Sequence, residues 1–439
     1  MRILHYFLGF HRAGGLNRYA GDLAREQARQ GHEVFALFPD GSVLPRRRAV
    51  IAMRRPHDRV GRFELLGGDP VPLLSGIRDP RMILAGRHRL SGEAVARFCD
   101  VVRPEVFHIH TWMGFPEELL DELKRRGTKI VFTTHDYFGL CPKVNFIDAS
   151  GKMCDAPDDR KCTVCNAGAP SERALAIRNS RMLLSMKKLL RPLAAALHHR
   201  SGAVPEAAVE VPEAGDYTAL REHYIGLLRR CDVIHANSEV SAGVYRRFAP
   251  DLPLRMVPIS HSVIVDRRRR RSVGEVVKLV FSGPGADFKG LPQLLRVLND
   301  LYGSGIRNWR LDVWGASECA ECPGATCHGS YDAARSAEVF GNGDLLIVPS
   351  IWNETFGFVI PEALSFGTPV LCSDTVGAQT LVPPEMVYHG ENGLRDKLEF
   401  LLRRPEELDR INRELCEAEF VWDMKSHTEK MSMLYNGAL

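Results

Sequence analysis

The order of short apolar runs and amphipathic segments along the chain predicts an α/β fold. After a first apolar run at Ile3–Phe7 come a turn at Gly14-Gly15 and a predicted helix over Leu16–Gln30, which Gly31 ends. Strands that alternate with helices in this way predict parallel βαβ units with helices on both faces of the sheet. The other predicted strands are Val34–Leu37, Val106–His110, Ile130–Thr134, Val233–Ala236, Leu254–Pro258, Val277–Ser282, Trp309–Trp314, Leu345–Pro349 and Val370–Ser373.

Two interruptions of this alternation indicate how the chain divides. Five consecutive arginines, Arg267–Arg271, carry like charges that repel one another, so we expect a solvated linker there. The strand pattern is also missing between about 141 and 220, which we interpret as an insertion in the first domain. We therefore predict two Rossmann-like, doubly wound domains at 1–265 and 275–415, followed by a helical segment at 416–439.

Composition and charge exclude several classes of protein. The chain has 439 residues, of which 45% are hydrophobic and 26% charged, as in an ordinary folded protein and unlike a disordered or fibrous one. The net charge of +4 is too small for a dedicated nucleic-acid binder, so we expect no nucleic-acid partner. The start, MRILHYFLGFHRAGG, reads as a strand and not as a signal peptide, and no apolar run reaches ~18 residues. We expect a cytoplasmic protein.

The segment Pro349–Glu362 is the strongest candidate for a binding site. It follows an apolar strand and leads into a predicted helix at Glu362–Phe366, whose N-terminus would offer free N–H groups to an anion. Gly357 lets the backbone approach a ligand, and the carboxylates of Glu354 and Glu362 can accept hydrogen bonds from sugar hydroxyls. Alternatively, the two acids are plain surface residues at a helix start, where acids are favoured.

This segment resembles the E-x7-E motif of glycosyltransferase family 4, whose members are retaining enzymes with the GT-B fold. Other segments resemble family motifs in the expected order along almost the whole chain. They are Arg12–Tyr19, His108–His110, Thr134–Tyr137 with Cys141-Pro142, Asn237-Ser238, Phe281–Gly283 with Lys289-Gly290, and Gly367–Val370.

The resemblance implies a fold and an activity. Two Rossmann-like domains would face a central cleft, with 416–439 crossing back to the N-terminal domain. The C-terminal domain would bind a nucleotide-diphosphate sugar, and the N-terminal domain a polysaccharide or lipid-linked glycan acceptor. The implied reaction is a retaining hexosyl transfer by front-face attack, without a covalent nucleophile and without a catalytic divalent metal.

The resemblance also assigns donor-binding roles to individual residues. Glu362 would bind the ribose hydroxyls, and Glu354 would lie beside the donor sugar. Lys289 would neutralise the leaving diphosphate, where the breaking bond deposits negative charge. Backbone N–H groups would complete this site, at Thr355, Phe356, Gly357 and Phe358 beside Glu354 and at Gly14 and Gly15 in the other domain.

The remaining catalytic candidate is His135. By resemblance it would lie on the acceptor side of the cleft and act together with Glu354 and Lys289. The alternative is a structural histidine at a strand end.

Two positions depart from the family pattern. Pro284 stands where family members commonly carry an arginine, and Gly377-Ala378 replaces the usual pair of glycines. These departures keep two alternatives open. One is a weak or inactive GT-B relative that acts as a binding or partner subunit, and the other is a GT-B sugar-nucleotide epimerase.

Eleven cysteines include a group with metal-ligand spacing. Cys141, Cys154, Cys162 and Cys165 form C-x12-C-x7-C-x2-C, and four thiolates suit tetrahedral Zn²⁺. The polar segment between them has no core of its own, so a structural zinc ion would supply folding energy. Free thiols or one disulfide are the alternatives.

A second group is Cys319, Cys322, Cys327 and His328. It has four potential zinc ligands, but the adjacent Cys327 and His328 would strain a single tetrahedron. We therefore regard this second zinc site as the weaker prediction. The other four cysteines, Cys99, Cys231, Cys372 and Cys416, are expected in the core.

The stretch Arg173–Arg200 admits two interpretations. Its apolar residues fall on one helical face and its basic residues on the other, and Pro192 should kink it. Such a helix can lie on an anionic membrane, which would make the protein peripheral on the inner face of the cell membrane. Alternatively, it packs its apolar face on the core and leaves a solvated basic face.

Overall fold

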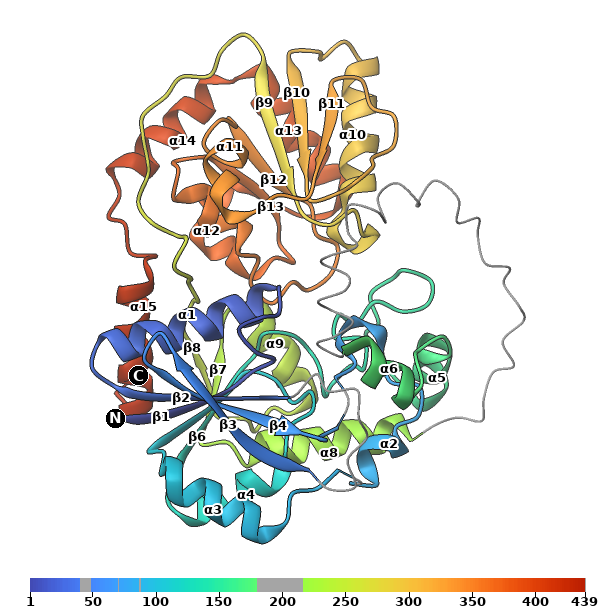
Figure 1. Cartoon of the computed structure of the whole chain (residues 1–439). Coiled ribbons are helices and arrows are strands. Elements are labelled where there is room, and N and C mark those ends of the chain that lie inside the picture. Colours follow the sequence, from blue (N-terminus) through green and yellow to red (C-terminus); the bar gives the residue numbers. More distant parts are fainter. Residues whose placement is uncertain (40–48, 70, 87, 180–215, 439) are drawn as a thin grey trace. The chain divides into compact units, whose positions relative to one another are not determined.

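The computed structural model describes residues 1–39, 49–69, 71–86, 88–179 and 216–438, which form two compact units (Figure 1). Unit 1 consists of Met1–His235 and Arg246–Arg255, and unit 2 of Ala236–Tyr245 and Met256–Leu439. Each unit contains one sheet surrounded by helices (Figure 1). The predicted fold class, a mixed α/β fold with two parallel-sheet domains, is confirmed.

The sheet of unit 1 has eight strands in the order β3-β4-β2-β1-β5-β6-β7-β8. Strand β1 pairs in parallel with both β2 and β5, whereas β3 and β4 form an antiparallel pair at one edge. The bounds are β1 Arg2–Tyr6, β2 Glu33–Pro39, β3 Val50–His57, β4 Val60–Leu66, β5 Val106–Ile109, β6 Lys129–Thr133, β7 Val233–Ala236 and β8 Leu254–Met256.

Helices cover this sheet and leave its central strands buried. All four residues of β5 are buried, and so are the last four residues of β1. Successive residues of a strand face opposite sides of the sheet. A strand of consecutive apolar residues therefore needs helices on both sides to keep its side chains from water. The helices are α1 Gly15–Arg29, α2 Arg81–Leu84, α3 Gly92–Val102, α4 Glu117–Arg125, α5 Asp159–Asn166, α6 Glu172–Asn179 and α8 Tyr217–Arg229. Helix α9, Glu239–Phe248, begins in unit 2 and ends in unit 1.

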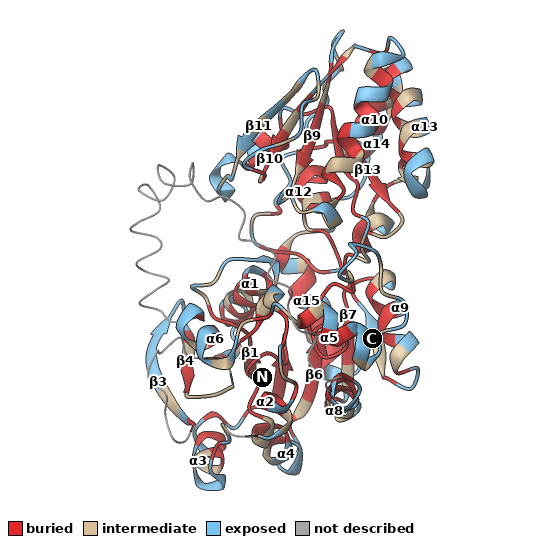
Figure 2. Cartoon of the chain, turned by 90° about the vertical axis from the view of Figure 1, so that its right-hand side faces the viewer, coloured by how far each residue is buried: buried red, intermediate tan, exposed pale blue. Residues whose placement is uncertain are grey.

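The sheet of unit 2 has six strands in the order β11-β10-β9-β12-β13-β14, and all neighbours are parallel. Strands β9 and β13 are largely buried, whereas the edge strand β11 contains no buried residue (Figure 2). The strands are β9 Val277–Ser282, β10 Trp309–Trp314, β11 Ala325–Gly329, β12 Leu345–Val348, β13 Val370–Ser373 and β14 Val387–Tyr388. The helices are α10 Leu291–Gly303, α11 Ser336–Val339, α12 Val359–Leu364, α13 Gly390–Arg403, α14 Glu406–Glu417 and α15 Met424–Asn436.

Helix α12 begins at Val359 and not, as predicted, at Glu362. Glu362 therefore lies in the first turn of a buried helix, and only 9% of its surface is exposed. Glu354 is exposed to the same extent. The alternative that both acids are plain surface residues is wrong, because burial of a carboxylate requires specific partners.

The five-arginine run has no regular secondary structure, as predicted, but it is not simply solvated. The Arg268 guanidinium donates to the carbonyls of Leu415 and Ala418, at the C-terminal end of α14. Arg271 donates to the carbonyl of Gly341, just after α11, at 2.7 Å. Three members of the run, Arg267, Arg269 and Arg270, are exposed as predicted. Arg268 and Arg271 depart from the prediction because helix C-termini present unpaired carbonyls that arginine can satisfy. The run belongs to unit 2.

Two other predictions stay open. Helix α15 is part of unit 2, and the return of 416–439 to the N-terminal domain stays a prediction. Of the basic stretch 173–200, the structure describes only the part that forms α6, and the rest lies outside the described residues. Among the helices that are described, none is long and apolar enough to cross a bilayer.

The arginine run offers a matched pair of variants. Replacing Arg268 by Ala should lower the free energy of unfolding by about 2 kcal/mol, since a nearly buried charged donor to two carbonyls is lost. Replacing Arg270, which pairs with Glu417 on the surface, should leave it nearly unchanged. Urea unfolding followed by tryptophan fluorescence measures both. Equal effects of the two substitutions would contradict the capping role.

Candidate active site

The candidate site of unit 2 lies where the strand order reverses. Strand β9 has β10 on one side and β12 on the other, so the chain leaves β9 and β12 in opposite directions across the sheet. The carboxyl ends of parallel strands at such a switch point are where ligands bind in open α/β sheets. The two segments that follow β9 and β12 are held together: the N–H of Ile351 donates to the carbonyl of Phe288 at 3.0 Å.

These two segments place Lys289 against Glu354. The ammonium of Lys289 lies 2.5 Å from Oε1 of Glu354, and the hydroxyl of Ser350 donates to Oε2 at 2.6 Å. Both oxygens of the Glu354 carboxylate are therefore engaged, one by a cation and one by a buried hydroxyl. Lys289 also lies 5.4 Å from the centre of the Trp352 ring. The structure thus brings together Lys289 and Glu354, two predicted residues far apart in the sequence.

The backbone around Glu354 is pinned to the segment after β13. The N–H of Glu354 donates to the carbonyl of Thr375 at 2.9 Å, and its own carbonyl accepts from Gly377 at 2.9 Å. At Gly357 the chain turns with φ +92°, and a β-carbon there would lie 2.8 Å from a methyl of Val376. Both the conformation and the close contact require glycine at this turn.

Three predicted residues flank Gly357. Thr355 and Phe356 are buried, and the hydroxyl of Ser238 donates to the Thr355 carbonyl at 2.5 Å. Phe358 occupies the N-cap of α12, and its ring packs edge-on against His261 at 4.8 Å between centres. The N-terminus of α12 is thus built into the same loop that carries Glu354.

His261 is a residue of this site that sequence reasoning missed. Its ring is fully buried, with Nε2 2.9 Å from Oε1 of Glu362. His261 precedes the arginine run, far from Glu362 in the sequence. Nothing in the local pattern indicates this pairing, since it depends on how the segment folds back over α12.

Unit 1 contains a buried chain of histidines that ends at His135. His5 Nδ1 lies 3.0 Å from His110 Nε2, and His110 Nδ1 lies 3.1 Å from His135 Nε2. At the other end, His5 Nε2 lies 2.7 Å from Oε1 of Gln27 on α1. The sequence pointed to His135, whereas His5 and Gln27 were missed because their contact is made only by folding.

Burial keeps the inner members of this chain neutral. Burial lowers the pKa of His5 to about 4, against a smaller opposing effect of its hydrogen bond with Gln27. Burial also lowers the pKa of His110 well below its usual value, and the neighbouring histidines add to this. With the amide oxygen of Gln27 accepting from His5 Nε2, neutral rings bond in one direction. His110 then donates from Nε2 to His5, and His135 donates from Nε2 to His110.

The histidines also offer metal ligands. Within the described part of the chain, one group of three or more His, Cys, Asp or Glu has all its ligand atoms within 4.8 Å of one another, namely His5, His108 and His110. These rings already hydrogen-bond to one another or to Thr133, which His108 contacts at 2.6 Å. A metal ion would have to replace those bonds, so hydrogen bonding is the simpler account of the cluster.

Gly14 and Gly15 lie at the N-terminus of α1. Gly14 is the N-cap with φ +111°, a backbone conformation that residues other than glycine rarely adopt. No side chain caps this end, and the first turn contains no acid. The first N–H groups of a 15-residue helix can therefore serve an anion.

Comparisons with known proteins match a part of each unit to a sequence family. Residues 13–153 match the sequence family described as Glycosyltransferase Family 4, and residues 277–415 match the family described as Glycosyl transferases group 1. The chain belongs to the glycosyltransferases of the family 4 type. The resemblance inferred from the sequence is confirmed. No curated protein matches the sequence.

Solved structures extend this glycosyltransferase assignment to the fold. Sucrose-phosphate synthase from Thermosynechococcus elongatus aligns with a TM-score of 0.60 and 14% identity, over 99% of this chain and 98% of that one. HepE from Anabaena, in complex with UDP and glucose, aligns at 0.55 and 12% over 99% of both chains. WaaG, a glycosyltransferase involved in lipopolysaccharide biosynthesis, aligns at 0.53 and 13% over 99% of this chain and 100% of that one. The fold of the glycosyltransferase is GT-B.

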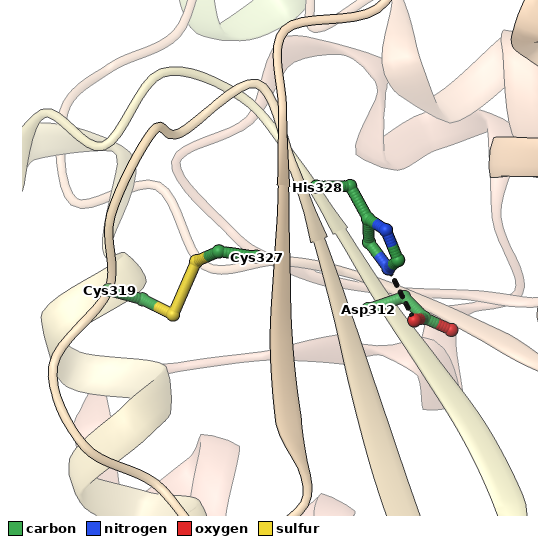
Figure 3. Close-up of a disulfide and its surroundings, with 4 residues drawn as sticks. All are labelled: Asp312, Cys319, Cys327 and His328. Carbon is green, nitrogen blue, oxygen red and sulfur yellow. Dashed lines mark hydrogen bonds and ion pairs between the residues drawn. A yellow bond between two sulfur atoms is a disulfide. The ribbon is translucent and has the colours of Figure 1, made fainter.

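The weaker of the two cysteine groups is arranged differently from the predicted set of metal ligands. Cys319 and Cys327 are joined by a disulfide, and His328 points away toward Asp312, with Nε2 2.7 Å from the carboxylate (Figure 3). Cys322 is a free thiol. Two disulfide sulfurs are not thiolates, so these four groups cannot act together as ligands in this form of the glycosyltransferase.

The histidine chain predicts how stability depends on pH. The unfolded chain protonates His5 near pH 6.5 but the folded chain only near 4, so stability should fall as pH falls between these values. For His5 alone the loss reaches about 3 kcal/mol at pH 4. Urea unfolding at pH 7, 6, 5 and 4.5 measures the slope.

The variant His5→Gln removes this group and should give a shallower slope below pH 6.5. His57→Gln, at an exposed histidine, is the matched control and should retain the wild-type slope. An unchanged slope in His5→Gln would show that His5 does not carry the pH dependence.

Proposed function

We propose that this protein is a retaining glycosyltransferase. It moves a sugar from a nucleotide-diphosphate sugar to a polysaccharide or a lipid-linked glycan. Membership of the family 4 type and the site at the β9/β12 switch point support this proposal. The solved relatives include one bound to UDP and glucose and one involved in lipopolysaccharide biosynthesis.

The observation that carries the proposal is the pairing of Lys289 with Glu354. When the bond between sugar and diphosphate breaks, negative charge develops on the phosphate oxygen that leaves. Lys289 supplies a positioned cation for that charge, and Glu354 holds it through a contact of 2.5 Å. The N-terminus of α12 follows directly in the same loop and can serve the same anion. In this reading Lys289 and Glu354 act as one unit at the donor.

Glu362 is the proposed ligand of the ribose. A carboxylate can accept hydrogen bonds from two neighbouring hydroxyls at once. The buried ring of His261 lies beside this carboxylate, with Nε2 2.9 Å from Oε1 but without hydrogen-bond geometry. Glu362 and Glu354 lie on one loop-helix segment, so nucleoside and sugar would be bound from a single element.

The engagement of Glu354 also bears on the reaction course. A nucleophile in a double-displacement mechanism needs a free carboxylate oxygen facing the sugar. Here one oxygen is paired with Lys289 and the other accepts from Ser350. This supports front-face transfer, in which the leaving phosphate takes the proton of the attacking hydroxyl. His135, at the end of the histidine chain, is proposed to contact the acceptor.

Replacing Glu362 tests the donor site. Glu362→Ala should weaken binding of the nucleotide-sugar about 10- to 100-fold, since hydrogen bonds to a charged group contribute about 1.5–3 kcal/mol. Calorimetric titration with UDP-, GDP- and ADP-sugars measures this and identifies the base. Glu362→Gln, which keeps the shape, should show a smaller loss.

Glu399→Ala is the matched control, because this acid pairs with Arg403 on the outer helix α13. Its donor affinity should equal that of the wild type. Donor affinity and turnover that stay unchanged in Glu362→Ala would refute the proposed site.

The anomeric configuration of the product tests whether the proposed transfer proceeds with retention. An α-linked donor should give an α-linked product, and proton NMR of the anomeric region during the first turnovers shows which anomer forms. A β-linked product would overturn retention while leaving the transferase assignment intact.

The same NMR experiment separates the alternatives that Pro284 keeps open. Release of a free, epimerised sugar without an acceptor would indicate an epimerase. Donor binding without any product would indicate a non-catalytic relative.

A further inference from the structure

Four cysteines of unit 1 converge from three short structural pieces that follow β6. Cys141 lies in a turn, Cys154 ends a small hairpin, and Cys162 and Cys165 lie on α5. All four are free thiols in a structure that does contain a disulfide elsewhere. None of the glycosyltransferase roles proposed above uses them.

The backbone turns tightly at Cys141: its N–H donates to the carbonyl of Tyr137 at 2.9 Å, and its carbonyl accepts from the N–H of Val144 at 2.9 Å. Burial raises the pKa of Cys141, and the neighbouring backbone N–H groups of Phe146, Lys143 and Asn145 oppose that rise. Val144 and Phe146 have φ values of +63° and +54°. Each such residue costs about 1–3 kcal/mol and persists only where the surroundings enforce it. A bound ion at this sulfur would provide such a reason.

The hairpin carries Cys154 back to this turn. Residues Ile147 and Met153 form an antiparallel bridge, and the N–H of Cys154 donates to the carbonyl of Phe146 at 2.7 Å. Asp148 closes the tip by accepting from the N–H groups of Ser150 and Lys152. The backbone at Cys154 is therefore bonded directly to the turn that surrounds Cys141.

Helix α5 supplies the other pair. Asp158 caps the helix by accepting from the N–H of Lys161, and Cys162 and Cys165 are three positions apart, on one face. Burial raises the pKa of Cys162 to about 12, against the effect of Arg221, and the thiols of Cys141, Cys154 and Cys165 add to the rise. Arg221 ties this helix to the turn at Cys141, because its guanidinium donates both to the Cys162 sulfur and to the carbonyl of Leu140.

A buried arginine beside these thiols has no acidic partner among the described residues. Arg221 on α8 is 8% exposed, and it donates to the Leu140 carbonyl at 3.0 Å and to the Cys162 sulfur at 3.7 Å. Among the ion pairs of the described residues, none includes Arg221. A buried cation needs a compensating negative charge. Four thiolates around Zn²⁺ carry a net charge of −2, which Arg221 would offset in part.

We propose that Cys141, Cys154, Cys162 and Cys165 bind one structural Zn²⁺ ion. In the present arrangement no three of these sulfur atoms lie within 4.8 Å of one another, so binding draws the thiols inward. Each thiol gives up its proton as its sulfur bonds to the metal, so four protons are released. The ion would tie the turn, the hairpin and α5 into one unit, in a segment that starts just after His135.

Metal analysis of the full-length protein tests this proposal. Protein purified under reducing conditions from zinc-supplemented cells should contain about one zinc ion per chain. Cys162→Ser/Cys165→Ser should lose it, whereas Cys416→Ser, a cysteine of α14 outside the group, should retain it. A double variant with the wild-type zinc content would overturn the proposal.

X-ray absorption of the wild-type protein gives a test that does not depend on folding of the variants. Four sulfur ligands at about 2.3 Å are expected. A first shell of nitrogen and oxygen would refute the site, as would zinc-free protein that takes up no zinc on titration. The remaining alternative is a disulfide among the four cysteines. Peptide mapping without reduction detects it, and such a disulfide in the freshly isolated protein would also refute the zinc site.

Discussion

The ion pair between Lys289 and Glu354 is the constraint on which the candidate donor site depends. A carboxylate that is only 9% exposed loses most of its contact with water, and the ammonium of Lys289 at 2.5 Å replaces part of it. Because the two residues follow different strands, their pairing also fixes the segments after β9 and β12 against each other. Ser350 completes the pairing of the carboxylate from within the second segment. The geometry of this edge of the sheet is thus set by electrostatics as much as by packing.

In the arginine run, too, charged side chains are stabilised by polar groups from distant parts of the chain. Two of the charges that repel one another along the sequence become stabilising because they find carbonyls near the ends of two different helices. Arg268 serves the end of α14, and Arg271 serves the chain after α11. A segment that looks like a spacer is therefore part of the packing of unit 2. The sequence alone does not show which helix ends lie near a run of charged residues. Whether such a run is solvated or packed therefore cannot be inferred from its charges.

Strongly periodic elements could be predicted from the sequence, and residues in long-range contacts could not. The strands β9, β10 and β13 are rich in apolar residues, and they fall at the predicted residues. The antiparallel pair β3 and β4 was missed, because an edge pair is partly solvated and its polar residues, such as Arg54 and Glu64, break the pattern.

The candidate site shows the same limit. Glu354, Glu362 and Lys289 could be located because a motif in the sequence carries them. His261 and Gln27 could not, because each is defined only by a partner that is distant along the chain. The boundary of α12 was also misplaced by three residues, since its N-cap is Phe358 and no polar capping side chain announces it.

The division of the chain into two units has a practical consequence. Residues 236–245 belong to unit 2 although residues on both sides of them, up to His235 and from Arg246, belong to unit 1. The polypeptide therefore enters unit 2, leaves it and enters it again. A single cleavage at any point between the two sheets leaves one fragment without a piece of its own fold. Expressing either unit alone therefore requires that an internal segment be removed and the two pieces that flank it be joined.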